Sequence, residues 1–263
     1  RKKNGKFNGV PKGETAMLTY IFVALGALML LLFLIVRNKH SGTKAIVLKT
    51  VTSLCFVACA LMAIAENAKL DLLPAQLLVV FGLVAGLLGD ITLDLRIYFQ
   101  SKADVMPQFK TDSENMTFVG MSSFGMGHVA YIAAAVLVSG NYKALIWSGL
   151  VAVALAAITM LVTTKVLKMQ FGKFFFISAA YAFLLAYFAA YCLFTLNSSP
   201  CAAHTACLVV GAVCFVVSDL ILSTTYFSHS EKYNKSGALN PESRLFIVTN
   251  HVTYYVAQFA IAL

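Results

Sequence analysis

Two carboxylates lie four residues apart inside an apolar stretch that runs from Leu83 to Leu95 (LVAGLLGDITLDL). On a helix, this spacing places Asp90 and Asp94 on one face, about one turn apart. A third carboxylate, Asp219, lies in a later apolar stretch, VCFVVSDLILS. A charged side chain at the centre of a membrane costs about 3 kcal/mol or more, so such groups usually face a polar cavity or a partner. We therefore interpret Asp90 and Asp219 as two halves of one intramembrane site.

The composition of the chain is that of a polytopic membrane protein. Of its 263 residues, 60% are hydrophobic and only 12% are charged, whereas soluble proteins are about 45–50% apolar and about 25% charged. The formal net charge is +9, but the basic residues lie in short loops and in the N-terminal tail. That distribution indicates membrane orientation and headgroup contact. No basic stripe interleaved with aromatic residues is present, so we expect no nucleic-acid partner.

Eight apolar segments follow the polar N-terminus, and each is about 20 residues long, the length that crosses roughly 30 Å of hydrocarbon. The sequence therefore predicts an all-α fold, a polytopic bundle of eight transmembrane helices. Residues 1–16 are predicted to form a polar N-terminal tail, and residues 17–263 a single transmembrane domain, with longer surface loops at 99–117 and 224–244. The predicted spans are 17–36, 45–65, 75–98, 118–139, 144–163, 174–196, 203–223 and 245–263.

Cations are distributed unequally between the two sets of loops. The loops that follow odd-numbered spans hold Arg37, Lys39, Lys44, Lys102, Lys110, Lys165, Lys168, Lys173, Lys232, Lys235 and Arg244. The opposite loops hold only Lys69 and Lys143. The positive-inside rule then puts the first set in the cytoplasm and both termini outside or in a lumen. The cations of the N-terminal tail argue for the reverse orientation, and we favour the loops. We expect the endoplasmic reticulum in a eukaryote and the inner membrane in a bacterium.

Three further spans place polar side chains at the depth of the carboxylates. Lys49 stands just inside the cytoplasmic start of the second span. His128 and Tyr131, in GMGHVAY, share one face of the fourth span near mid-membrane. The eighth span contributes Asn250, His251, Tyr254, Tyr255 and Gln258. Beside Asp90 and Asp219 as catalytic residues, we predict that the substrate is bound by Lys49, Asp94, His128, Tyr131, Tyr255 and Gln258.

Each of these residues also has a purely structural interpretation. Asp90 and Asp219 could be held by hydrogen bonds between helices, and Asp94 could reach the membrane interface. Lys49 could extend its ammonium group to the lipid headgroups. A single histidine in a helix, such as His128, is more often a packed core residue than a ligand. The tyrosines could serve as packing or interface aromatics.

Other catalytic chemistries have little support in the sequence. No GxSxG, HExxH, P-loop or dinucleotide-binding motif is present. The six cysteines are scattered and form no CxxC, so we expect neither a disulfide framework nor a cysteine metal site. A zinc site could be assembled only at long range, from His128, His251 and aspartates. We therefore expect no metal and no cofactor.

Several stretches together resemble the YhhN family, the membrane proteins that include lysoplasmalogenases. The resemblance extends from the first span to the end of the chain, and the combination of GD, F-x3-H-x2-Y and SD is fairly specific. Family members usually have proline after the lysine of the second span, where this chain has Thr50. The matching stretches are VLKTVT (47–52), LLGDITLDL (87–95), FVGMSSFGMGHVAYIAA (118–134), VSDLILS (217–223) and TYYVAQFAIA (253–262).

The resemblance implies hydrolysis of the vinyl ether bond of lysoplasmalogen. The products would be a fatty aldehyde and glycerophosphocholine or glycerophosphoethanolamine. Vinyl ethers hydrolyse when a proton reaches the alkene carbon, and a carboxyl shielded from water can keep and deliver that proton near neutral pH. A second, ionised carboxylate can stabilise the cation and orient water.

Asp90 and Asp219 would share these two roles, with the assignment left open. His128 or Tyr131 would orient a carboxyl or the water, and Lys49 or loop cations would meet the substrate phosphate. A lysolipid with one chain suits a cavity that opens laterally to the cytoplasmic leaflet.

Besides the hydrolase, two other functions are compatible with the same residues. Proton-coupled carriers and membrane receptors also use intramembrane aspartates near a lysine. None of the five prolines lies inside a predicted span, so the sequence does not indicate the broken helices common in transporters. A non-catalytic protein that binds lysolipids is the third possibility. The sequence leaves the oligomeric state open.

Overall fold

The structure of the protein, a computed structural model, describes residues 12–37, 42–67, 71–199, 202–228, 240 and 243–263. Eight of its helices are long and apolar enough to cross a membrane, and no strand occurs in these ranges. The predicted all-α bundle of eight spans is therefore confirmed. The helices are α1 (Lys12–Val36), α2 (Thr43–Asn67), α3 (Leu73–Gln100), α4 (Gln108–Ser139), α5 (Tyr142–Leu161), α6 (Phe175–Thr195), α7 (Ala202–Phe227) and α8 (Arg244–Ala262). A π-helical turn, Val162–Val166, extends α5, and a 3-10 turn, Gly172–Phe174, precedes α6.

Two helices begin well before the apolar segments that predict them. Helix α4 starts at Gln108 rather than near residue 118, and α1 starts at Lys12, inside the predicted tail. Hydropathy marks only the part of a helix that can lie in hydrocarbon, whereas backbone hydrogen bonding continues into polar sequence. The loop predicted at 99–117 is correspondingly shorter. The rest of the predicted tail, residues 1–11, and most of the predicted loop 224–244 lie outside the described residues.

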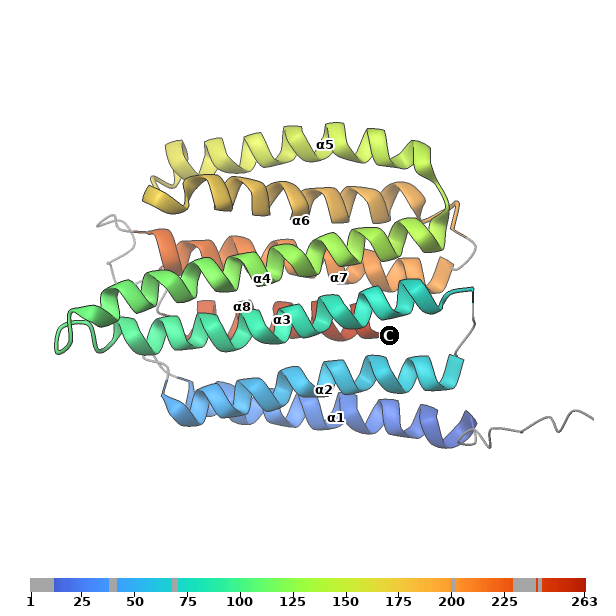
Figure 1. The fold of residues 1–263 in the computed structure, drawn as a ribbon, viewed down its shortest axis with the longest axis horizontal. Helices are drawn as coiled ribbons and strands as arrows, with labels where there is room; N and C mark the ends of the chain where they lie inside the picture. The colour runs from blue at the N-terminus through green and yellow to red at the C-terminus, as the bar shows by residue number, and fades with distance from the viewer. Residues whose placement is uncertain (1–11, 38–41, 68–70, 200–201, 229–239, 241–242) are drawn as a thin grey trace, which may run out of the picture.

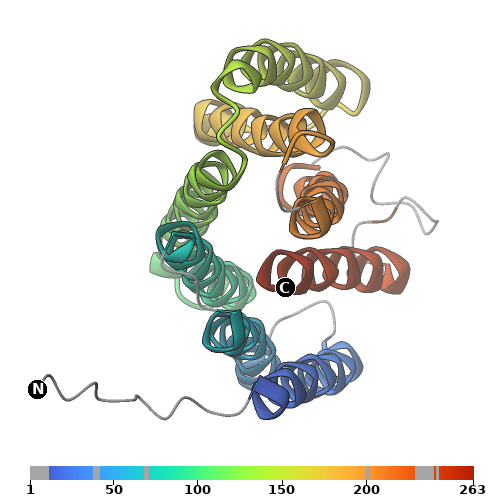
Figure 2. The same cartoon turned by 90° about the vertical axis from the view of Figure 1, so that its right-hand side faces the viewer.

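The helices are arranged as a curved layer that encloses two inner helices. Viewed along the bundle, α1, α2, α3, α4, α6 and α5 follow one another around the curve, and α7 and α8 lie on its concave side (Figure 2). Helix α8 packs against α7, α2, α3 and α1, and α7 also packs against α6. Helix α8 therefore lies against α2 and α3, the helices that carry Lys49 and Asp90, and α7 lies between α8 and α6 (Figure 1).

Helix α3 packs closely against both α4 and α8 because it has glycines where these two helices place large side chains. A Cβ atom added at Gly82 would lie 2.2 Å from the ring of Tyr131 on α4, and one at Gly86 would lie 2.5 Å from Nε2 of Gln258 on α8. Both distances are too short for a side chain to be accommodated without movement of its neighbours. These two glycines therefore have a packing role, because they let α4 and α8 approach α3 closely.

We expect a Gly82→Ala substitution to destabilise the protein by about 1–3 kcal/mol, because the buried Tyr131 ring must move. Gly125→Ala is the matched control, since its added Cβ would meet only Leu184 Cδ1, at 3.7 Å. Replacing glycine by alanine inside a helix otherwise stabilises it by about 0.8–1 kcal/mol. Thermal unfolding in detergent measures both variants. Equal melting temperatures for the two would contradict this account of the α3–α4 contact.

The start of α8 is tied to the end of α1. The Ser243 hydroxyl caps α8 by accepting a hydrogen bond from the Phe246 backbone N–H at 3.3 Å. The Arg244 guanidinium donates to the carbonyl of Arg37 at 2.8 Å and to that of Leu34. These carbonyls end α1 and have no partner within that helix, so a cation is favourable there. This contact fixes Arg37 beside the first turn of α8.

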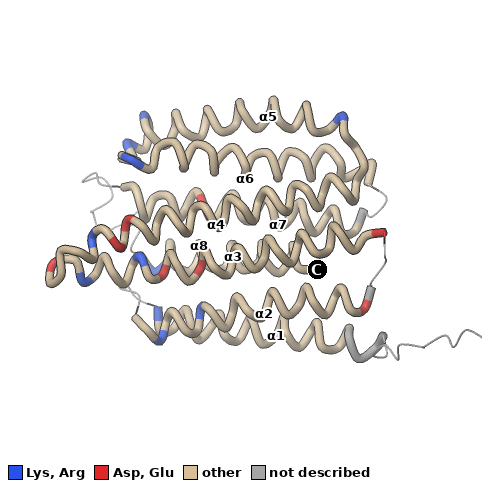
Figure 3. The backbone as a smooth tube through the Cα atoms, viewed as in Figure 1, with Lys and Arg blue, Asp and Glu red and all other residues tan. Residues whose placement is uncertain are grey.

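Most of the described Lys and Arg residues lie at one end of the bundle, where α1 and α3 finish and α8 begins (Figure 3). At the opposite end the described charges are few (Figure 3), and Lys143 lies there in the first turn of α5. This arrangement is the asymmetry that the loop sequences predict. We call the first end the cationic end.

Candidate functional site

A polar cavity of about 410 Å³ lies between α2, α3, α7 and α8 near the cationic end. Its walls include the last residue of α3 and residues that follow α1 and α7, so it extends to the helix ends. Both predicted catalytic carboxylates line this cavity, although they come from different helices. Its charged side chains are Arg37, Lys49, Asp90, Asp94, Arg96 and Asp219.

Lys49 bridges the two carboxylates of α3. Its Nζ lies 3.2 Å from Asp90 Oδ1 and 3.3 Å from Asp94 Oδ1, and the three side chains are 9%, 3% and 2% exposed. One ammonium group can reach both carboxylates because they stand one turn apart on the same helix face. A buried charge that lacked such partners would be strongly destabilising. The ion triad therefore holds α2 against α3 and neutralises part of the charge on Asp90 and Asp94.

The second oxygen of Asp90 accepts two hydrogen bonds. Ser53 Oγ donates to Asp90 Oδ2 at 2.6 Å, and the Tyr254 hydroxyl donates to the same atom at 2.7 Å. With Lys49 at the other oxygen, Asp90 is surrounded by donors. An acceptor-only, ionised carboxylate is the form that suits these partners.

A chain of hydrogen bonds behind Asp90 fixes the direction of the Tyr254 hydroxyl. The Tyr131 hydroxyl donates to Gln258 Oε1 at 3.0 Å, and Gln258 Nε2 donates to the Tyr254 oxygen at 2.8 Å. Because that oxygen already accepts, its single proton is the one donated to Asp90. Tyr255 is part of the same network through Ser53, since the two hydroxyl oxygens are 3.1 Å apart.

Tyr131, Tyr255 and Gln258 do not line the polar cavity. They are buried behind it, and they contact the partners of Asp90 rather than the cavity space. They are thus placed to position the partners of Asp90, and direct contact with a ligand in this cavity stays a prediction that their location does not favour. Lys49 and Asp94, which share that prediction, do line the cavity.

Asp219 has different surroundings from Asp90. The Tyr181 hydroxyl of α6 donates to Asp219 Oδ2 at 2.6 Å. Within the described part of the chain, no lysine, arginine or histidine forms an ion pair with Asp219. It is half-buried on α7. With one donor and no cation beside it, this carboxyl is free to exist in the protonated form.

Asp219 also lines a second, apolar cavity of about 320 Å³ between α5, α6 and α7. Most other residues of its walls are apolar or aromatic, with contributions from the π-helical turn and from α3 and α4, and four serine and threonine residues also line it: Thr159, Thr163, Ser178 and Ser223. The two cavities share five wall residues, which are Leu93, Phe124, Asp219, Leu222 and Tyr226. Asp219 is thus the carboxyl residue among the five that the polar cavity and the apolar cavity share.

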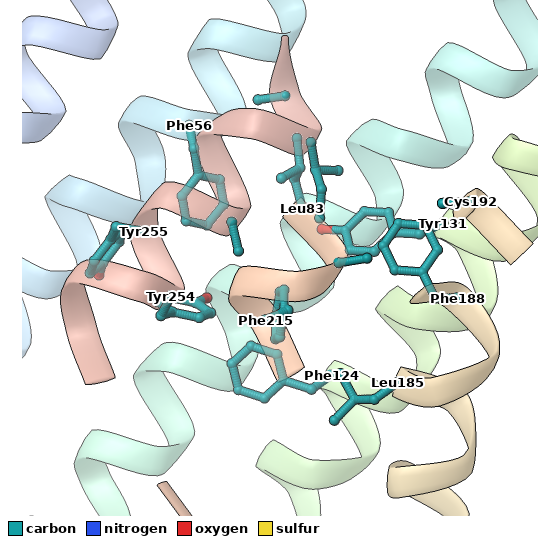
Figure 4. Close-up of a cluster of buried hydrophobic side chains, with 14 of the residues drawn as sticks. Phe56, Leu83, Phe124, Tyr131, Leu185, Phe188, Cys192, Phe215, Tyr254 and Tyr255 are labelled. Carbon is teal, nitrogen blue, oxygen red and sulfur yellow. The ribbon is translucent and has the colours of Figure 1, made fainter. Parts of the chain in front are cut away.

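His128 lines neither cavity. Its Nδ1 is 2.9 Å from the Phe124 carbonyl oxygen, and its ring centroid is 4.6 Å from that of Phe215 and 5.6 Å from that of Tyr181. It packs against the aromatic cluster that includes Phe124, Phe215 and Tyr131 (Figure 4). His128 therefore contacts the tyrosine that holds Asp219, and it is not placed to touch a ligand in either cavity.

Three important residues are not among those predicted from the sequence. Ser53 lies one turn after Lys49, on the same face of α2, so its helical spacing is a signal that could have indicated it. Arg96 lies two residues after Asp94 and could have been noticed for its charge beside an apolar stretch. Tyr181 lies in a run of aromatic and apolar residues and carries no such signal. Only the packing of α6 on α7 brings it to Asp219.

The site offers hydrogen bonds, ionic contacts and proton transfer. Among the residues that the structure describes, no three His, Cys, Asp or Glu side chains gather where they could hold a metal ion. His251 lines the polar cavity, and its Nδ1 lies 2.7 Å from the Ile247 carbonyl oxygen.

Comparison with known proteins identifies the family of the chain. No curated protein and no solved structure shows a significant match. The sequence model of the YhhN family matches residues 44–263, which include seven of the eight membrane-spanning helices and every carboxylate of the site. With these spans, the protein is an integral, multi-pass membrane protein. Because the match covers most of its length, the chain belongs to the YhhN family.

Proposed function

We propose that the protein is a lysoplasmalogenase, which hydrolyses the vinyl ether bond of lysoplasmenylcholine or lysoplasmenylethanolamine. The observation that carries the proposal is the place of Asp219 at the junction of a polar and an apolar cavity. A lysoplasmalogen also has one polar and one apolar part, because its vinyl ether joins a polar glycerophospho group to a single hydrocarbon chain. With each part in the matching cavity, the reacting bond lies at the junction.

The surroundings of the two carboxylates support different roles for them. Asp90, with Lys49 at one oxygen and two hydroxyl donors at the other, is suited to remain ionised. Asp219 has a single donor, Tyr181, and is suited to carry the proton. The pairing of an ionised carboxylate with a protonated one is how enzymes divide such work. We assign Asp219 as the general acid and Asp90 as the group that stabilises the developing cation.

The reaction then proceeds in balanced steps. Asp219 transfers its proton to the alkene carbon that does not carry oxygen, and the neighbouring carbon becomes an oxocarbenium ion. A water oxygen attacks that ion and returns a proton to Asp219, which leaves a hemiacetal. The hemiacetal breaks its bond to the glycerol oxygen, and the hydroxyl proton moves to that oxygen. One water is consumed, and a fatty aldehyde and a glycerophospho alcohol are formed.

The proposal is tested with purified protein and a lysoplasmalogen in detergent or liposomes. We expect release of aldehyde in equal amount to the glycerophospho product. We also expect no product from the saturated 1-O-alkyl analogue, which has no alkene carbon to protonate. Binding without aldehyde release would instead indicate a lysolipid-binding protein, and flux of lipid across liposomes without cleavage would indicate a transporter.

The expected cellular setting of this activity follows from the orientation argument. The polar cavity reaches the cationic end of the bundle, which the positive-inside rule assigns to the cytoplasm. The substrate would therefore be drawn from the cytoplasmic leaflet. We propose the endoplasmic reticulum as the location in a eukaryotic cell and the inner membrane in a bacterial one.

A further inference from the structure

Arg96 is a cation of the polar cavity that the proposed reaction does not use. Its guanidinium carbon lies 4.2 Å from the centroid of the Tyr226 ring on α7, in a cation–π contact. Its Nε is buried and has no hydrogen-bond partner among the described residues. No carboxylate within the described ranges forms an ion pair with it. Lys49, in contrast, is fully engaged by two carboxylates.

The three cations of the polar cavity differ in their partners. They are Arg37, Lys49 and Arg96. Lys49 is held by Asp90 and Asp94, and Arg37 has interactions of its own. Arg96 forms no ion pair with a carboxylate of the described residues. A phosphodiester group carries one negative charge and would give Arg96 an ionic partner.

We propose that Arg96, held by Tyr226, binds the phosphate group of a single-chain phospholipid in the polar cavity. This inference rests on the proposed function and assigns the part of the site that recognises the headgroup. A guanidinium suits the role because its planar donors match phosphate oxygens, and stacking on Tyr226 orients it before the ligand arrives. The phosphate contact therefore belongs to Arg96 rather than to Lys49, which the sequence suggested for it.

The position of Arg96 fits a headgroup site. It stands one turn before the end of α3, and the cavity beside it is also lined by Gln100, Ser101 and Ser228 at helix ends. The glycerophospho product would thus lie toward the membrane surface at the cationic end. The hydrocarbon chain would lie beyond Asp219 in the apolar cavity.

The test is equilibrium binding of 1-O-alkyl-lysophosphocholine, which has no vinyl ether to cleave, to the full-length protein in detergent. We expect Arg96→Met to weaken binding by tenfold or more and Arg96→Lys, which keeps the charge but not the planar donors, to recover only part of it. Binding of 1-O-alkylglycerol, which has the same chain but no phosphate, should not change. Lys102→Met is the matched control, because it removes an exposed cation just after α3 that does not line the cavity. Thermal unfolding of each variant verifies that it is folded.

Competition experiments distinguish the two possible sources of the phosphate. Displacement of the lipid analogue by glycerophosphocholine, lost in Arg96→Met, supports a lipid headgroup site. Displacement by inorganic phosphate at equal or lower concentration would overturn that assignment in favour of a free-anion site. Equal weakening of the phosphate-bearing and phosphate-free lipids by Arg96→Met, or no weakening of either, would also overturn it.

Failure of this inference is separable from failure of the proposed function. If wild-type protein releases no aldehyde but binds the lipid analogue in an Arg96-dependent way, the hydrolase proposal falls and the phosphate site stands. If cleavage occurs and Arg96→Met leaves binding intact, the phosphate site falls and the hydrolase proposal stands.

Discussion

An Asp219→Asn variant is expected to lose about 10²- to 10⁴-fold of its turnover on lysoplasmalogen, the usual contribution of a general acid. Asparagine has nearly the shape of aspartate, but its amide has no proton that can be delivered to carbon. Its carbonyl oxygen can still accept the hydrogen bond from Tyr181, so the contact between α6 and α7 is kept. The effect should therefore appear in kcat, with little change in lipid binding or in thermal unfolding.

Solvent deuterium gives a second reading of the same step. In D₂O, Asp219 would deliver a deuteron in place of a proton. The aldehyde should then carry one deuterium on the carbon next to its carbonyl, and this label is measured after the aldehyde is reduced as it forms. Asp104→Asn is the control, since Asp104 is exposed in the turn after α3 and lies outside both cavities. A folded Asp219→Asn variant that retains the wild-type rate would remove Asp219 from the mechanism.

A Lys49→Met variant is expected to be destabilised by about 3–5 kcal/mol, the cost of leaving buried charges without their partner. Two carboxylates, Asp90 and Asp94, depend on this one ammonium group, at 3.2 and 3.3 Å. Methionine fills a similar volume without the charge, so the loss is electrostatic rather than a packing defect. Thermal unfolding in detergent should show a large fall in Tm, and activity should fall with it because Asp90 loses its counter-ion.

Compensating changes test the cause of that loss. A triple variant, Lys49→Met with Asp90→Asn and Asp94→Asn, removes all three charges of the triad together and should recover much of the stability while remaining inactive. Lys173→Met is the matched control, because Lys173 pairs with Glu114 on an exposed surface and such pairs contribute about 0–1 kcal/mol. If Lys49→Met and Lys173→Met shift Tm equally, the buried triad does not stabilise the bundle as described.

The two experiments separate the structural and the chemical roles of the carboxylates. Asp90 contributes to both, since it is held by α2 and α8 and is also part of the proposed reaction centre. Asp219 is expected to contribute mainly to chemistry, because one hydrogen bond from Tyr181 is its link to a neighbouring helix among the described residues. We therefore expect stability to respond to Lys49 and rate to respond to Asp219.

The sequence alone determined those features of the protein that follow from the local spacing of residues and from the apolar surroundings of the membrane. Apolar segments about 20 residues long predict the eight spans, because only a helix satisfies its own backbone in hydrocarbon. The four-residue spacing of Asp90 and Asp94 predicts their shared face, and the geometry of α3 follows from it. The cost of burying charge explains why these residues and Asp219 line a polar cavity rather than face lipid.

Helix ends and side-chain partners were less predictable. Hydropathy identifies only the apolar part of a helix, so it places the start of α4 near residue 118, although the helix begins at Gln108. The sequence places the polar residues Tyr131, Tyr255 and Gln258 at the depth of the carboxylates, and in the structure they belong to the hydrogen-bond network around Asp90. The depth of a residue in the membrane does not show whether its side chain faces a cavity or packs against a neighbouring helix. These three side chains lie behind Asp90, on the side away from the polar cavity.

The tertiary structure decided which helices pack together, and this packing determined the hydrogen-bond and ionic partners of each carboxylate. Tyr181 reaches Asp219 because α6 packs on α7, and Lys49 reaches Asp90 because α2 packs on α3. These contacts join residues 38 and 41 positions apart in the chain, where no local periodicity can indicate a pairing. Proton affinity depends on such neighbours rather than on residue type. The sequence therefore determined that acidic groups lie within the membrane, and the packing of α2, α6, α7 and α8 decided how their surroundings differ.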